Sequence, residues 1–396
     1  SFQNGMPHRV ISDHLRMVSF SLADGVMPSN EGRGYVVRRI LRRAIRFGRV
    51  LEIKDEFLFT LVDVLINILG DAYPELLDKK DHIKKVIESE EVSFGRTLDR
   101  GLILFDEICN QTKKEFISGE DTFKLYDTYG FPLDLTQLLA KERKLKIDVK
   151  KFDSLMLQQK ERARSKGKFS ANNEENKWNE LITDNHSNFV GYDLEEVEGS
   201  ICMYRFKESK LELVLSITPF YAESGGQVGD TGEIVSDNFI FVVEDTYKEG
   251  DKICHLGVIK KGDISEMKNI KVMMRIDSAR RGKIKLNHTG THLLHKALKL
   301  VLGGHVQQAG SLVSNDKLRF DLTHYQKINN NELIEIENKV NEIIEENISL
   351  NIENTSFENA KKGGAEALFG EKYGDQVRVV DVKGFSKELC GGTHVN

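Results

Sequence analysis

Two short motifs near the C-terminal end of this chain constrain its fold most. Residues 288–292 read HTGTH and residues 390–394 read CGGTH, and each carries two metal-binding side chains four positions apart. On a helix such a pair shares one face, with side chains about 5–6 Å apart. The candidate ligands are His288, His292, Cys390 and His394. They form a full tetrahedral set for zinc, so we expect one zinc ion per chain and a fold that brings two distant segments together.

The composition is that of a globular protein. The chain has 396 residues, room for two or three domains, with 39% hydrophobic and 30% charged residues. It has neither an apolar run long enough for a membrane span nor a secretory signal at its start, so we expect no membrane partner and a cytoplasmic location. Four cysteines are too few for a disulfide framework, which indicates a reducing compartment. Because the chain begins with Ser1, we expect it to be a piece of a longer protein.

Residues 1–165 are predicted to form a helical domain. Apolar residues recur at helical spacing, and Asn30 is a suitable N-cap for a helix over 31–47. Further helices are expected over 55–68, in the long charged segment after Pro74, and over 151–165. The polar residues 166–188 are predicted to be a linker.

The remaining chain changes character twice. Residues 189–277 alternate β-branched or aromatic residues with polar ones between Gly-rich turns, which predicts a small β-barrel. Residues 278–396 predict an α+β core: a helix from Ser278 to about Leu302, a hairpin within 311–323, a helix over 332–346, and strands near 349–354 and 377–382. The predicted fold class is therefore multidomain, α followed by α+β, with helices packed on an antiparallel sheet around the zinc site.

The role of the metal is left open by the sequence. A closed four-ligand site would only stabilise the fold, whereas a catalytic zinc keeps one position for water unless Cys390 is loosely held or faces substrate. A metalloprotease is excluded because no Glu lies between the paired histidines. Thr291 is either a hydroxyl for a substrate or an ordinary helix-surface residue, and Gln308 can point inward. Gly225 and Gly226 fit a simple turn or a backbone nest for a ligand.

A dense run of arginines marks the segment 31–50, which holds seven arginines and one acid although the net charge of the chain is −5. Arg38, Arg42, Arg46 and Arg49 fall on one helical face. A face of this charge without acidic partners suits phosphate, and guanidinium groups bind phosphate well. The alternative is a solvated face that pairs with acids elsewhere.

Several sequence segments, spread over essentially the whole chain, resemble those of the alanyl-tRNA synthetase family. Residues 9–14 and 23–35 resemble the start of its helical tRNA-recognition region, and residues 125–132 (LYDTYGFP) are a second marker. Residues 220–227 (FYAESGGQ) and both metal motifs resemble its editing domain.

The resemblance implies a division of labour. The helical part would bind the acceptor stem of tRNA(Ala), with Asn30 and Asp127 reading its G·U wobble pair in the readable minor groove and Arg38, Arg42 and Arg46 contacting phosphates. The editing part would hydrolyse Ser-tRNA(Ala) or Gly-tRNA(Ala), because an alanine pocket cannot reject these amino acids by size alone. Zinc would bind His288, His292, Cys390 and His394. Thr291 and Gln308 would line the amino-acid pocket, with Cys390 also facing the substrate and the backbone of Gly225 and Gly226 nearby.

Two departures from the family follow. The aminoacylation core that binds ATP and Mg²⁺ is absent, so we expect this chain not to activate alanine. The chain also ends two residues after His394, where the family continues, so we expect an incomplete editing domain. Alternatives are a free-standing trans-editing deacylase, disfavoured by the helical markers, and a non-catalytic zinc-stabilised RNA-binding module. We expect a monomer without an obligate protein partner.

Overall fold

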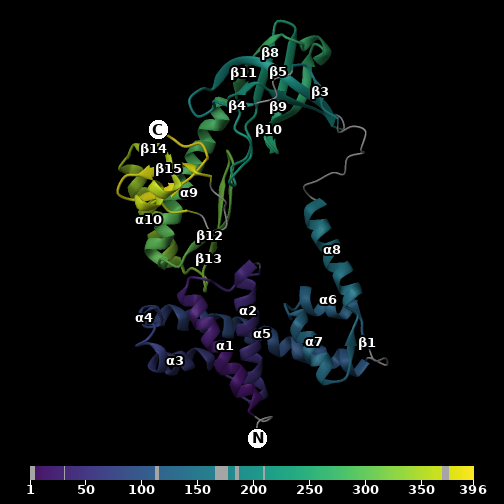
Figure 1. Cartoon of the computed structure of the whole chain (residues 1–396), viewed down its shortest axis with the longest axis vertical. Helices are drawn as coiled ribbons and strands as arrows, with labels where there is room; N and C mark the ends of the chain where they lie inside the picture. The colour runs from purple at the N-terminus through teal and green to yellow at the C-terminus, as the bar shows by residue number, and fades with distance from the viewer. Residues whose placement is uncertain are drawn as a thin grey trace. The chain divides into compact units, whose positions relative to one another are not determined.

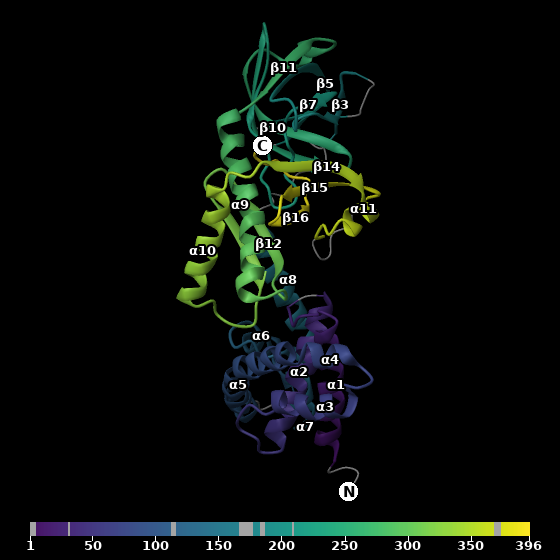
Figure 2. The same ribbon diagram turned by 90° about the vertical axis from the view of Figure 1, so that its left-hand side faces the viewer.

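The computed structural model describes residues 5–30, 32–111, 116–165, 177–182, 187–207, 210–367 and 374–396, with side chains omitted at 160–165. The chain divides into two units, Ser1–Phe169 and Ser170–Asn396, each of which is described by itself. Helices and strands are both abundant, which confirms a mixed, multidomain architecture (Figures 1 and 2). No helix in the described part combines the length and apolar character needed to cross a bilayer.

The first unit is mainly helical (Figure 1). Its helices are α1 (Met6–Ala23), α2 (Gly32–Val50), α3 (Leu61–Leu69), α4 (Pro74–Asp78), α5 (Lys80–Gln111), α6 (Gly119–Asp127), α7 (Leu133–Glu142) and α8 (Val149–Ser165), with a 3-10 turn at Leu58–Thr60. Short strands β1 (Phe116–Ile117) and β2 (Lys146–Ile147) pair in parallel. The predicted helices over 31–47 and 151–165 are confirmed by α2 and α8, apart from the undescribed Glu31.

The helix predicted from position 55 begins later than expected. The carboxylate of Glu91, on α5, accepts hydrogen bonds from the backbone N–H groups of Phe57, Leu58 and Phe59 at 2.9–3.1 Å. These N–H groups precede α3 and have no helical carbonyl to bind, so the buried acid replaces one. The α-helix therefore starts only at Leu61, after the 3-10 turn.

The second unit contains a closed six-stranded barrel, as predicted. Its strands are β5 (Glu196–Lys207), β6 (Lys210–Leu215), β8 (Gly232–Ser236), β9 (Phe239–Glu249), β10 (Lys252–Lys261) and β11 (Lys271–Ile276), with a 3-10 turn at Ile264–Met267. The order is β11-β8-β9-β10-β6-β5, and β11 pairs back to β5. Alternate residues of β9 face the interior, where Phe239 and Phe241 are fully buried. The period-2 pattern of the sequence produces this inward row.

Part of the predicted linker is strand. Strand β3 (Asn179–Glu180) pairs with β5, and β4 (Asn188–Phe189) pairs with β7 (Ile217–Thr218). Trp178 packs against a small buried cluster of the barrel, which explains why this segment is held there. Residues 166–176 and 183–186 of the linker lie outside the described residues. The domain boundaries at 188 and 277 stay predictions.

The remaining elements include the helix that carries the first metal motif. They are α9 (Ser278–Leu302), β12 (Gln307–Val313), β13 (Leu318–Thr323), α10 (Asn330–Glu345), β14 (Leu350–Ser356), α11 (Phe357–Lys362), β15 (Gln376–Val382) and β16 (Ser386–Leu389). α9 ends before Gly303 as predicted, but its N-cap is Asp277 rather than Ser278, because the Asp277 carboxylate accepts from the N–H of Arg280. α10 packs along α9 (Figure 2), and β14, β15 and β16 form an antiparallel sheet.

Candidate metal centre

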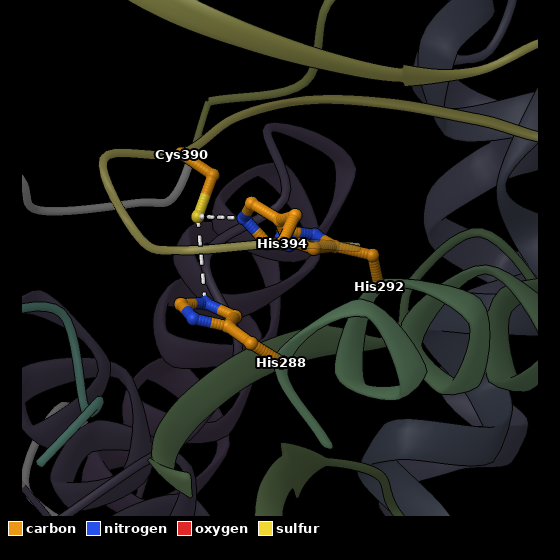
Figure 3. Close-up of side chains that lie close together, drawn as sticks. All are labelled: His288, His292, Cys390 and His394. Atoms are coloured by element: carbon orange, nitrogen blue, oxygen red, sulfur yellow. Dashed lines mark hydrogen bonds between the residues drawn. The ribbon is translucent and has the colours of Figure 1, made fainter. Parts of the chain in front are cut away.

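The two sequence motifs meet in the second unit. His288 and His292 lie one turn apart on α9, with their rings stacked at 5.5 Å and only 6° between planes. Cys390 directly follows β16, and His394 lies in the loop beyond it. The ligand atoms of these four residues all lie within 4.8 Å of one another, and the side chains converge in Figure 3. This cluster could hold a metal ion, as the spacing predicts.

The histidines turn the same ring atom towards the sulfur. Nε2 of His288 lies 3.4 Å from Sγ of Cys390, and Nε2 of His394 lies 3.3 Å from it. Nε2 of His292 is buried without a hydrogen-bond partner among the described residues. A buried, unpartnered ring nitrogen is costly unless something binds it. A metal ion at this point would satisfy that atom and join it to the other three donors.

The opposite ring nitrogens identify the tautomers. Oε1 of Gln227 accepts the backbone N–H of Thr393 at 2.9 Å, and Nδ1 of His288 lies 2.7 Å from the same oxygen. Since one acceptor atom serves both contacts, Nδ1 of His288 must carry the proton. Nδ1 of His292 likewise donates to the carboxylate of Glu388 at 2.7 Å. The Nε2 lone pairs are thereby left for a metal, which is the usual arrangement around metal-bound imidazoles.

Glu388 links two histidines of α9 to the sheet. Besides His292, it accepts from Nδ1 of His295 at 3.0 Å and from the hydroxyl of Ser386 at 3.0 Å. The side chain is almost completely buried. Burial opposes its ionisation, but the bonds from the two imidazoles hold the pKa of Glu388 far below its usual range. A fixed negative charge therefore lies directly behind one candidate ligand.

Three contacts shape the loop that carries Cys390. The guanidinium of Arg378 donates to the carbonyls of Cys390 and Gly392 at 3.0 and 2.8 Å, and it stacks on the ring of Tyr192. The hydroxyl of Tyr192 donates to the carbonyl of Gly391 at 2.6 Å. A Cβ at Gly392 would lie 2.0 Å from Cε1 of His288, so the loop approaches α9 too closely for any other residue.

The pKa values of the clustered side chains are those of a site that can bind a cation. Burial works against ionisation of Cys390, but the charge of His292, followed by contacts with the neighbouring imidazoles, holds the pKa of its thiol well below the ordinary value. Burial also opposes a charged His292, but Cys390 and Glu388 raise its pKa to about 10. Burial lowers the pKa of His394 to about 4. A divalent ion would replace protons at this centre, because imidazole and thiol groups bind metal only in their deprotonated forms.

Two residues predicted to line a substrate pocket have protein partners. The hydroxyl of Thr291 donates to the carbonyl of Asn287 at 2.9 Å, and the residue is buried. Gln308, on β12, donates from Nε2 to the hydroxyl of Ser311 at 3.2 Å. Thr291 therefore satisfies its hydroxyl proton within α9 and can only accept from a ligand. Their substrate roles stay predictions.

The Gly-rich turn serves the metal centre through a residue that the sequence analysis left without a role. Gly225 and Gly226 have positive φ values of 59° and 82°. A Cβ on Gly226 would come within 2.3 Å of the hydroxyl of Ser311, so the close approach is to β12. The turn places the fully buried side chain of Gln227 in contact with His288. The position of Gln227 directly after two glycines was the one feature of the sequence that could have indicated this role. A nest for a ligand stays a prediction.

The arginine face of α2 has the acidic partners that the sequence analysis did not expect. Arg38 and Arg42 both bind Glu90, at 3.2 and 2.8 Å, and buried Arg46 binds Glu142 at 2.6 and 2.7 Å. The expectation that this face lacks acids is wrong, because its partners lie on α5 and α7, far away in sequence. Arg33, Arg39 and Arg43 are exposed and have no ion pair among the described residues. Phosphate binding by Arg38, Arg42 and Arg46 stays untested.

The two predicted readers of the acceptor stem are both exposed in the first unit. The side-chain oxygen of Asn30 accepts from Arg38 at 2.6 Å. The carboxylate of Asp127, at the end of α6, accepts from the side-chain amide of Gln159. A nucleic acid that used either residue would have to replace these bonds.

Sequence comparison assigns the chain to the class II tRNA synthetases. The profile of the family described as "tRNA synthetases class II (A)" matches residues 2–280, which is most of the sequence, and the chain belongs to this family.

Its curated relatives include proteins named alanine–tRNA ligase. The relative from Thermoanaerobacter sp. (strain X514) is 46% identical over 399 residues, that from Legionella pneumophila (strain Paris) 46% over 395, and that from Idiomarina loihiensis 48% over 398. Each alignment covers 98% of this chain but 45% of the relative. The chain thus spans about half the length of these relatives, and the resemblance seen in the sequence is confirmed.

Proposed function

We propose that this chain is part of an alanyl-tRNA synthetase and joins an acceptor-stem recognition region to a zinc-dependent editing site. The site would hydrolyse the ester of Ser-tRNA(Ala) and Gly-tRNA(Ala). The observation that carries the proposal is the cluster of three imidazoles and one thiolate within 4.8 Å, in a chain whose relatives are alanine–tRNA ligases. In the whole protein this region would accompany ATP-dependent attachment of alanine to tRNA(Ala).

The donor set suits zinc. His288, His292, Cys390 and His394 would hold it, and imidazole with thiolate is a common zinc set. When bound, zinc would supply a Lewis acid that polarises a carbonyl oxygen or lowers the pKa of a water. Gln227 and Glu388 would orient two of the imidazoles from behind.

Cys390 would decide whether the site is catalytic. It is the least buried of the four residues, so a substrate would approach on its side. If Cys390 stays bound, the centre is closed and only stabilises the loop. If it moves aside, a coordination position opens for the amino-acid end of the tRNA. Thr291, as an acceptor, and Gln308 would contact that amino acid.

Recognition of the tRNA would fall to the first unit. Asp127 would accept from the exposed guanine amine of a G·U pair, and Asn30 can both donate and accept there. We assign the general phosphate attraction to the exposed Arg33, Arg39 and Arg43, because Arg38, Arg42 and Arg46 already bind acids.

A deacylation assay tests the proposal. The chain is loaded with zinc and incubated with Ser-tRNA(Ala), beside a Cys390→Ala variant and a matched Cys109→Ala variant from the other unit. We expect hydrolysis by the parent and by Cys109→Ala, and its loss in Cys390→Ala. Zinc and tRNA binding with no hydrolysis by any of them would contradict editing and favour a zinc-stabilised RNA-binding module.

A further inference from the structure

The first unit contains a cavity with both charged and apolar walls that the editing and G·U-reading roles do not use. It has a volume of about 460 Å³ and lies between α1, α2 and α7. Its walls include His14, Arg39, Arg43, Asp134 and Leu135. Cavities of 300–1,000 Å³ are the usual size for small-molecule sites. This one is therefore large enough for a ligand of nucleotide size.

Two cations in this cavity lack an anionic partner. Arg39 and Arg43 are one turn apart on α2, and neither has a carboxylate within 4.0 Å among the described residues. The neighbouring Arg42 differs, because Glu90 binds it at 2.8 Å. Two guanidinium groups at this spacing suit a phosphate, which accepts from several N–H groups at once.

The same cavity also has unused acceptor capacity. Oδ1 of Asp134 and Nε2 of His14 are buried, and neither has a hydrogen-bond partner in the described part of the chain. Burial, and after it the charge of Arg43, lower the pKa of His14, so its ring adds no positive charge. The ionised carboxylate of Asp134 only accepts, so its partner must be a donor, and the N–H groups of a base can serve as one.

Together these groups suit a ligand that has an anionic group at one end and hydrogen-bond donors at the other. Inorganic phosphate would satisfy the arginines but would place an anion beside Asp134. A nucleotide carries both a phosphate and a base with N–H donors, and the apolar side chains Ile40, Leu135 and Leu138 offer contact area for the flat base. Guanine suits a carboxylate best, because its N1–H and N2–H groups can bind both oxygens.

We propose that the cavity between α1, α2 and α7 binds one unpaired nucleotide of an RNA, with its phosphate on Arg39 and Arg43 and its base on Asp134, and that it prefers guanine. This inference rests on the proposed function for the identity of the RNA. It would add a contact to a single base outside the paired stem. Proteins commonly bind splayed-out bases in such pockets.

Mononucleotides test the cavity without any tRNA. Calorimetric titration of the full chain with GMP, UMP, guanosine, inorganic phosphate and alanine compares the ligand ends separately. We expect GMP to bind more tightly than every other probe. The variant Arg43→Gln should weaken GMP binding roughly tenfold, as loss of a charged hydrogen bond does. Arg100→Gln, at an exposed arginine on α5 that does not line the cavity, should leave it unchanged.

A second variant keeps the test sharp. Asp134→Asn should reduce the difference in affinity between GMP and UMP, while the affinity for inorganic phosphate stays the same or increases. The inference is overturned if GMP binds no better than inorganic phosphate, if alanine binds more tightly than GMP, or if Arg100→Gln weakens GMP binding as much as Arg43→Gln does. None of these outcomes touches Ser-tRNA(Ala) hydrolysis at the metal centre, so the two proposals fail separately.

Discussion

The side-chain oxygen of Gln227 lies 2.7 Å from Nδ1 of His288 and connects the Gly-rich turn to the metal centre. The same oxygen accepts the N–H of Thr393, and the amide nitrogen of Gln227 donates to the Thr393 hydroxyl at 3.0 Å. One buried amide thus fixes His288 on α9 and the loop between Cys390 and His394. The centre depends on a residue that is not a ligand.

Removal of this amide should weaken metal binding. We expect Gln227→Ala to lower zinc affinity by about 10–100-fold, the usual effect of losing a partner behind a metal ligand. Competition with a chromogenic chelator measures it. Gln376→Ala, at an exposed position on β15, is the matched control and should retain the parent affinity. An unchanged affinity in Gln227→Ala would show that His288 needs no such support.

A methyl group at position 392 should be far more harmful than one at position 391. In Gly392→Ala the new Cβ would lie 2.0 Å from Cε1 of His288, whereas at Gly391 the nearest atom is 4.0 Å away. Backbone or α9 must shift in the first variant, so we expect loss of bound zinc and a lower melting temperature. Gly391→Ala should keep both. Metal content after dialysis and thermal unfolding distinguish them, and equal behaviour of the two variants would contradict this geometry.

The metal centre also shows how far sequence reasoning reaches. The spacing of His288 and His292 reports a shared helical face, because a helix repeats every 3.6 residues and is a local structure. Glu388 and Gln227 belong to a strand and a turn from elsewhere in the chain, and only tertiary packing brings them to α9. The arginine face failed for the same reason: Glu90 lies 48 residues from Arg42, and a local window of charge does not contain it.

The barrel should lose stability in acid through one buried carboxylate. Burial opposes the charge of Glu212, but hydrogen bonds from Tyr247, Arg205 and Lys207 outweigh it and lower its pKa. A group with a lowered folded pKa stabilises the protein above the unfolded value, about 4.3, and this contribution is lost as the pH falls through the folded value. We therefore expect Glu212→Gln to lower the unfolding free energy by roughly 3 kcal/mol at pH 7, by analogy with broken buried ion pairs.

Denaturant unfolding at several pH values checks the role of Glu212. The difference between parent and Glu212→Gln should shrink as the pH falls below about 4. Glu249→Gln, at a half-exposed partner of the same arginine, should cost less than about 1 kcal/mol. A difference that stays constant from pH 7 to acid would contradict an ionic role for Glu212.

The arginines of α2 should separate into stabilising and RNA-binding groups. Buried Arg46 holds Glu142 with two short bonds, so Arg46→Ala should lower the melting temperature. Exposed Arg33 has no ion pair among the described residues, so Arg33→Ala should keep the melting temperature and reduce the salt dependence of tRNA binding by about one phosphate contact. Thermal unfolding and binding at several salt concentrations test both. If Arg33→Ala lowered the melting temperature and Arg46→Ala instead reduced the salt dependence of tRNA binding, α2 would present its other face to RNA.

Asp127 offers the sharpest test of acceptor-stem recognition. Its carboxylate accepts from the exposed Gln159, and the base-reading role requires that this bond can be exchanged for a guanine amine. We expect Asp127→Ala to reduce the preference for a G·U over a G·C stem by about tenfold, the value of a good base-edge contact, with a smaller loss on G·C. Gln159→Ala removes the competing donor and should keep or increase the preference. Affinity measured for short hairpins of both kinds tests this, and equal losses on G·U and G·C in Asp127→Ala would show that the carboxylate does not read the base pair.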